Sequence, residues 1–254
     1  MAEDTPAPET TEQPASAGAP LWRRIILWTG AGLVGLVVLV GAMLLFLNTT
    51  PGKRFLIGQI AALEMESGMK IGIGRIEGSI YSRMTIRDLT LSDPKGVFAS
   101  SPEVTVDWSP FRYINSHIMA REVTSPLVTL ARGPEFKPTQ SDPNAPILPD
   151  LDIDIDRLRI DRFVLNRPVI GEQRVLSIDA STHIADGRAQ LRSNVRADSG
   201  DRLAAFLDAV PAQDRLEMKG QLDAPAGGVV ARMSGLTDTM TATLDGKGLS
   251  LIHI

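Results

Sequence analysis

The sequence predicts a mainly β protein, with an N-terminal transmembrane helix followed by a curved, elongated, β-taco-like sheet trough and one to three short helices. Three observations predict this class. Residues 25–47 form an uncharged apolar run. After residue 69, the spacing of apolar residues changes from helical to alternating. One strand-like motif also recurs at intervals of 34 and 40 residues. Such repeats indicate an array in which each unit buries its apolar face against the next.

The apolar run contains 23 residues without a charged side chain, and a helix of that length is about 34 Å long. This length exceeds the ~30 Å hydrocarbon core of a bilayer, so we expect a transmembrane anchor over residues 21–48. A cleaved signal peptide is the alternative, but its apolar region is shorter and ends at a small-residue cleavage site. Two basic residues flank the run on each side. The number of basic residues is therefore equal on the two sides and does not decide the orientation; we favour a cytoplasmic N-terminus.

The remaining segments follow from composition. Residues 1–20 contain four prolines, four acidic residues and no basic residue, which predicts a disordered acidic tail. Residues 50–68 predict a short amphipathic helix beside the membrane, with Thr50 as its N-cap. This helix either closes the near end of the domain or lies at the membrane interface. Residues 69–248 form the β-rich repeat domain. We set residues 249–254 apart as a candidate non-native segment and interpret the chain as a fragment of a longer protein.

The repeat has the spacing apolar-x-apolar-x-x-apolar-x-apolar. It begins at residues 84 and 158, with a weaker copy at 118, and charged pairs fill the double gap at 87–88 and 161–162. Two residues between apolar positions keep one face apolar only if the strand is bulged or bent there. Bulges increase twist, so the sheet should curve. We expect ten side chains to share one concave face: Met84, Ile86, Leu89, Leu91, Val104, Val106, Leu158, Ile160, Phe163 and Leu165.

No pattern of residues predicts catalysis, a cofactor or a metal ion. The charge is nearly balanced and no basic patch suggests nucleic acid. The absence of cysteine excludes thiolate sites. An alternating acidic segment is either a Ca²⁺ site or a solvated strand face, and we favour the second because carboxylates along a straight strand do not converge; its members are Asp150, Asp152, Asp154 and Asp156. We expect no enzyme. The rival hypothesis is a hydrolase assembled from distant residues, with Asp107, His117 and His183 as its candidates.

Four motifs follow the apolar run in a specific order. They are Pro51-Gly52-Lys53-Arg54, Ile73-Gly74-Arg75-Ile76-Glu77-Gly78-Ser79-Ile80, Leu89-Thr90-Leu91-Ser92-Asp93-Pro94-Lys95-Gly96 and Val104-Thr105-Val106-Asp107-Trp108-Ser109-Pro110. With these motifs the chain resembles, over about residues 20–248, the N-terminal region of the TamB family of translocation and assembly module proteins, which are AsmA-like, bridge-like lipid-transfer proteins.

The resemblance implies an inner-membrane anchor, a periplasmic β-trough and a role in outer-membrane biogenesis. The cargo it implies is phospholipid, carried between the inner and outer membranes. The alternative is a scaffold for assembly or secretion of outer-membrane and autotransporter proteins with the barrel partner TamA, whose contact region belongs to the C-terminal domain of the family. The family has no catalytic residues.

The residues by themselves lead to a similar expectation. An uncovered apolar face on a tethered sheet is a candidate groove for phospholipid acyl chains. The alternative is that large side chains of the protein fill this face as a closed core. A scaffold would act chiefly through exposed sheet edges, by strand addition to a client.

Overall fold

The computed structural model describes residues 21–63, 65–137, 151–235 and 237–249. The chain divides into two compact units, Met1–Leu45 and Phe46–Ile254. The predicted acidic tail, the aspartate at position 150 and most of the segment 249–254 lie outside the described residues. The predicted mainly β class is confirmed, because an eleven-stranded mixed sheet dominates the second unit.

A long helix precedes the sheet. Helix α1 covers Leu21–Leu47 and contains no acidic residue. No helix in the described part of the chain qualifies alone as a membrane span by length and composition; Gly32–Leu47 and Thr50–Ala62 qualify only jointly, as a bent pair. The predicted passage of residues 21–48 through a membrane therefore stays a prediction.

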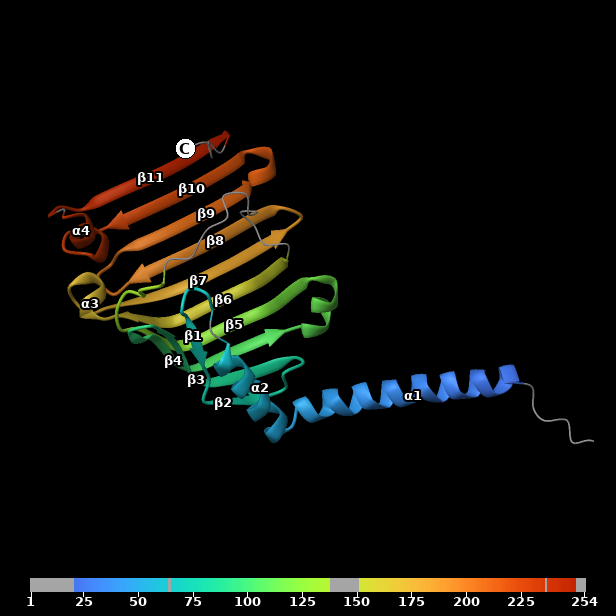
Figure 1. Cartoon of the computed structure of the whole chain (residues 1–254). Coiled ribbons are helices and arrows are strands. Elements are labelled where there is room, and N and C mark those ends of the chain that lie inside the picture. Colours follow the sequence, from blue (N-terminus) through green and yellow to red (C-terminus); the bar gives the residue numbers. More distant parts are fainter. Residues whose placement is uncertain (1–20, 64, 138–150, 236, 250–254) are drawn as a thin grey trace, which may run out of the picture. The chain divides into compact units, whose positions relative to one another are not determined.

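The predicted amphipathic helix is α2, Thr50–Ala62, and it packs against the first two strands of the sheet (Figure 1). Its N-cap is Thr49, so the predicted cap is wrong by one residue: the Thr49 hydroxyl accepts a hydrogen bond from the Gly52 amide at 3.4 Å. Gly52 is buried where the chain leaves α1, and a Cβ there would lie 2.1 Å from the Phe46 carbonyl oxygen. Only glycine fits this junction.

The strands follow one another across a single sheet, as Figure 1 shows. They are β1 Lys70–Gly72, β2 Arg75–Gly78, β3 Arg83–Asp93, β4 Gly96–Trp108, β5 His117–Leu130, β6 Asp152–Leu165, β7 Arg174–Ala185, β8 Arg188–Ala197, β9 Arg202–Val210, β10 Arg215–Ala224 and β11 Met240–Leu249. The order is β1-β3-β4-β5-β6-β7-β8-β9-β10-β11, with β2 also pairing with β3. Short helices join them: η1 Pro110–Asn115, α3 Arg167–Ile170, η2 Pro211–Gln213 and α4 Val229–Ser234.

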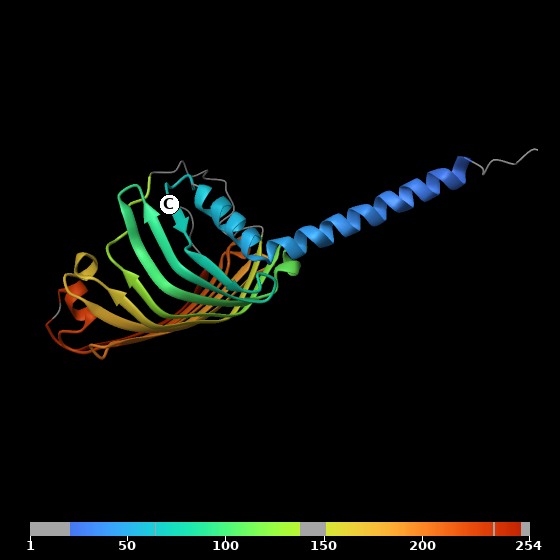
Figure 2. The same ribbon diagram turned by 90° about the horizontal axis from the view of Figure 1, so that it is seen from below.

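Every strand pair is antiparallel except β5 with β6. A parallel pair requires the chain to return along the length of the sheet before the next strand begins. The connection from β5 to β6 includes residues 138–150, which lie outside the described part. In Figure 2 the strands are seen to bend, which agrees with the predicted curvature.

Two features of the C-terminal half differ from the sequence prediction. The strands β7, β8 and β9 have no counterpart in the repeat motif, although they lie within the sheet between β6 and β10. Residues 245–248, with the sequence Asp-Gly-Lys-Gly, form no turn, because they pair continuously with β10 inside β11. Gly246 pairs with Met218 and Gly248 pairs with Leu216. Because glycine has no side chain, it leaves room beside each of these large side chains.

Candidate functional site

Strand β7 establishes which side chains share a face. Its pairing with β8 runs without a register shift from Leu176 to Ala185, so alternate residues of β7 lie on one face. Three of these face residues have partners on β6: Leu176 with Phe163, Ile178 with Ile160 and Ala180 with Leu158. The register between β6 and β7 shifts between Ile160 and Phe163, which confirms the predicted bulge at 161–162. A second shift lies between Ile155 and Leu158.

Two rows of register partners extend this face to the start of the sheet. They are Leu158–Val123–Val106–Met84 and Leu165–Leu130–Ala99–Leu91. Register partners point to the same side of a sheet, and so do residues two apart on one strand. All ten predicted side chains therefore share one face, which we call the apolar face. Their role in binding a ligand stays a prediction.

Of the two alternatives predicted for the double gap at 87–88, a bulge or a bend, the strand has no bulge. The pairs on either side of Asp88 keep one register, Arg87 with Glu103 and Leu89 with Ser101, so neither strand gains a residue. Instead, Asp88 adopts a left-handed conformation with φ 54°. In this register Pro102 of β4 lies opposite Asp88. Because proline has no N–H, the strand pair loses no hydrogen-bond donor at this position. The bend is therefore shared by both strands.

The apolar face continues through β8 to β11, where the sequence analysis assigned no site residue. The rows from β7 keep strict register across these strands: Ile178–Val195–Leu203–Leu222–Ala242, Ala180–Ser193–Ala205–Gly220–Leu244 and Thr182–Leu191–Leu207–Met218–Gly246. Alternation of apolar residues in 189–209 and 216–222 was the signal that could have found them.

The side chains of this face are only partly covered. Of the ten predicted residues, Leu165 alone is buried, and the other nine are half-buried. Toward β11 exposure increases, and the exposed fractions of Leu191, Leu203 and Leu244 are 41%, 39% and 53%. These three leucines line one hollow of about 550 Å³ over β8 to β11. No large side chain is fully buried among the residues that the structure describes, so the face is not closed as a core.

A buried polar pair interrupts the apolar face at β4 and β5. Ser101 and Ser125 are buried, and their hydroxyl oxygens lie 2.9 Å apart. Each lies within 2.9 Å of the Glu103 carbonyl oxygen. The two serines sit next to Pro102 and Pro126, which donate no N–H to the sheet, so the hydroxyls supply hydrogen bonds that the backbone cannot.

The opposite face carries charges and ion pairs. Arg188 donates two hydrogen bonds to the Asp208 carboxylate, Nε to Oδ1 at 2.8 Å and Nη2 to Oδ2 at 2.5 Å. The guanidinium lowers the pKa of Asp208 to about 2, against the opposing effect of burial. This distribution leaves the sheet with one apolar and one ionic surface.

Two predicted candidates of the rival hydrolase meet on the ionic face. Asp154 lies between them: His117 Nε2 is 2.6 Å from Asp154 Oδ2, and His183 Nδ1 contacts Asp154 Oδ1. Burial acts to raise the pKa of Asp154, but the hydrogen bonds from the two histidines outweigh it, so this pKa lies below its ordinary value. The third candidate, Asp107, instead pairs with Arg121 on β5. The sequence analysis had treated Asp154 as part of a solvated strand face.

The hollow beside His183 contains a hydroxyl but no nucleophile bound to a base. Its volume is about 310 Å³, and Ser181 is among its lining residues. No hydrogen bond joins Ser181 to either histidine within the described residues. Over the same part of the chain, no group of three or more His, Asp or Glu side chains is arranged to hold a metal ion.

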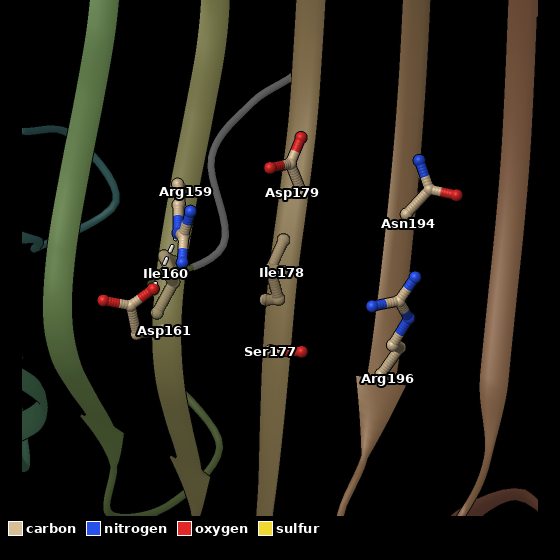
Figure 3. A pocket seen from close by; sticks show the side chains of 8 residues that line it. All are labelled: Arg159, Ile160, Asp161, Ser177, Ile178, Asp179, Asn194 and Arg196. Carbon is tan, nitrogen blue, oxygen red and sulfur yellow. Dashed lines mark hydrogen bonds and ion pairs between the residues drawn. The ribbon is translucent and has the colours of Figure 1, made fainter.

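A further hollow of about 410 Å³ lies across β6, β7 and β8 (Figure 3). Its charged lining is mixed, because Arg159 and Arg196 are accompanied by Asp161 and Asp179. Arg159 Nε donates to Asp161 Oδ1 at 2.7 Å, which Figure 3 marks as a dashed line. Since its cations and anions balance, this hollow has no net charge with which to select an ionic ligand.

No known family, curated protein or solved structure matches this chain.

Proposed function

We propose that the chain is a membrane-tethered β-trough that carries phospholipid between two membranes, with the acyl chains lying along the apolar face. The proposal places the tether at residues 21–48 in an inner membrane and the sheet in the periplasm. The acyl chains lie on the concave side of the sheet. The TamB-like motifs support this localisation. We also propose that the protein has no catalytic activity.

One observation carries the proposal: the apolar face continues from β3 to β11 and remains partly open. Exposed apolar surface of this extent normally marks a binding surface in a soluble sheet. Its side chains are mainly aliphatic and its register is unbroken from β7 to β11, so a flexible hydrocarbon chain finds a similar surface at each strand. The ionic face on the other side keeps the sheet hydrated.

Photo-crosslinking of the full chain in vesicles tests the proposal. The vesicles contain a phospholipid with a diazirine on its acyl chain, and mass spectrometry locates the adducts. Adducts should form at Ile86 and Leu203 and should be absent at their neighbours Thr85 and Ala204, which point to the ionic face. Equal yields on the two faces, or adducts confined to α1, would contradict an acyl-chain groove.

A second candidate function rests on the sheet edge. Strand β11 pairs with β10 through ten consecutive residues, and within the described residues it has no other partner. Such an edge can accept a strand from another protein. A scaffold for outer-membrane and autotransporter proteins, acting with TamA, would use it. Binding of an unfolded outer-membrane strand peptide by a chain that gains no lipid adducts would favour this function over lipid transport.

A further inference from the structure

Three segments that are distant in sequence meet beside the end of helix α1. Asn48 directly follows this helix, and its side-chain oxygen accepts a hydrogen bond from the Ile80 amide at 3.2 Å. Lys53, in the first turn of α2, donates to the Gly78 carbonyl oxygen. Trp108 Nε1 at the end of β4 donates to the Ile80 carbonyl oxygen at 3.1 Å. These bonds fix residues 79–82 between the α1–α2 junction and the start of η1.

Aromatic side chains that are exposed or half-buried lie in these segments. Tyr81 and Phe111 stack with their ring centroids 5.5 Å apart and their planes at 19°. Phe111 is 56% exposed, although it is a large apolar side chain. Phe55 on α2 is 54% exposed. Aromatic rings that are neither buried in a core nor isolated are typical of the boundary between a bilayer and water.

The charges of the same segments all have one sign. Residues 48–55, 79–82 and 109–116 contain Lys53, Arg54 and Arg112 and no acidic residue. Arg54 and Arg112 are exposed. The acidic residues that border these segments are already paired, Glu77 with Arg75 and Arg87 and Asp107 with Arg121. Each basic residue close to an anionic bilayer favours binding about fivefold.

We propose that Phe55, Tyr81, Phe111 and the basic residues Arg54 and Arg112 form an interfacial surface that docks on an anionic phospholipid bilayer. Tyr81 of this surface directly follows Ile80, whose amide donates to Asn48, the residue after α1, so the surface would lie at the headgroup layer if α1 is the tether. This inference rests on the tether in the proposed function. It adds that the end of the sheet is held on the membrane surface, so the apolar face begins at the lipid headgroups.

The absence of cysteine allows a clean test on the full chain. A nitroxide label is placed through Phe111→Cys or, to preserve the ring stack, through Arg112→Cys. The control is Phe136→Cys. Phe136 is also exposed, at 48%, but contacts Phe98 at the other end of β4. The chain is reconstituted in vesicles of equimolar phosphatidylethanolamine and phosphatidylglycerol, and collisions of the label with a water-soluble nickel complex and with oxygen are compared.

Nickel collisions at positions 111 and 112 should fall several-fold relative to position 136, while oxygen collisions rise. Adding Arg54→Glu to the variant labelled at 111 should shift the docked fraction at least about tenfold toward water in anionic vesicles, and much less in phosphatidylcholine. A chain that floats with the vesicles but has labels equally open to nickel at 111, 112 and 136 overturns the interfacial surface alone, and it would point to a protein partner there. A chain that does not float overturns the tether as well.

Discussion

Leu203→Asp separates an open lipid-binding face from an ordinary half-buried strand surface. Leu203 lies on β9 between Val195 and Leu222 and is 39% exposed. Because full burial of a leucine contributes about 1.5–3 kcal/mol, covering its exposed part with an acyl chain contributes about 1 kcal/mol. The substitution removes this contribution and would place a carboxylate beneath hydrocarbon, which costs several kcal/mol when the charge is unpaired.

The free protein should tolerate the same change. At 39% exposure the new carboxylate remains in contact with water, so we expect a loss of stability of about 1 kcal/mol from strand propensity and packing. Lipid binding should therefore weaken much more than folding. The diazirine adduct yield over β8 to β11 should fall at least about tenfold, whereas the thermal midpoint should change by only a few degrees.

Ala204→Asp is the matched control. It adds the same charge at the next residue of β9, on the ionic face opposite Asn194 and Gln221. Its adduct yield should equal that of the unsubstituted chain, and its stability should change by no more than about 0.5 kcal/mol. An undiminished yield in folded Leu203→Asp would refute the groove assignment. Unfolding of Leu203→Asp would refute the argument that this face is open.

Three further predictions concern stability. Arg132→Met removes the cation that binds both oxygens of Asp93, whose side chain has no solvent exposure, so the thermal midpoint should fall by roughly 10 °C, and less in Arg132→Lys. The depressed pKa of Asp208 means that its carboxylate stabilises the fold above the ordinary aspartate pKa and ceases to do so as pH falls toward about 2; denaturant titrations from pH 5 to pH 2 should show about 2 kcal/mol less loss in Asp208→Asn than in the unsubstituted chain. Gly52→Ala should open the α1–α2 junction to proteolysis because its Cβ meets backbone at 2.1 Å, whereas Gly58→Ala, with nothing within 4 Å, should not.

The strand motif made the first half of the sheet predictable. Its apolar positions on β3 and β6 are large aliphatic residues at a fixed spacing, so hydrophobic periodicity identified both strands. The strands β7 and β8 were missed because their face residues include small or polar ones such as Ala180 and Thr182. Their hairpin signal was nevertheless present. Asp186 and Gly187 both have positive φ, 51° and 70°, as a two-residue turn requires.

The cluster at Asp154 could not be predicted from sequence. His117 and His183 lie on different strands, and they reach one carboxylate only because β5 runs parallel to β6 in a particular register. The hydrophobic pattern specifies which face a residue takes but not which residues of a distant strand stand opposite. The same limit applies to the interfacial surface, whose segments are brought together at Ile80: its amide donates to the Asn48 side chain, and its carbonyl oxygen accepts from Trp108 Nε1.

The two bulges of β6 explain how the sheet keeps one apolar face while it bends. Opposite β7, β6 gains a residue at each of two register shifts. Each extra residue would turn the following side chains to the ionic face if the spacing of apolar residues stayed at two. The spacing of three at each shift, from Ile155 to Leu158 and from Ile160 to Phe163, restores the face. Since β6 is longer than its partner over the same rows, the pair must curve. The double gap in the sequence thus serves curvature and a continuous apolar surface together, which a flat, strictly alternating strand would not provide.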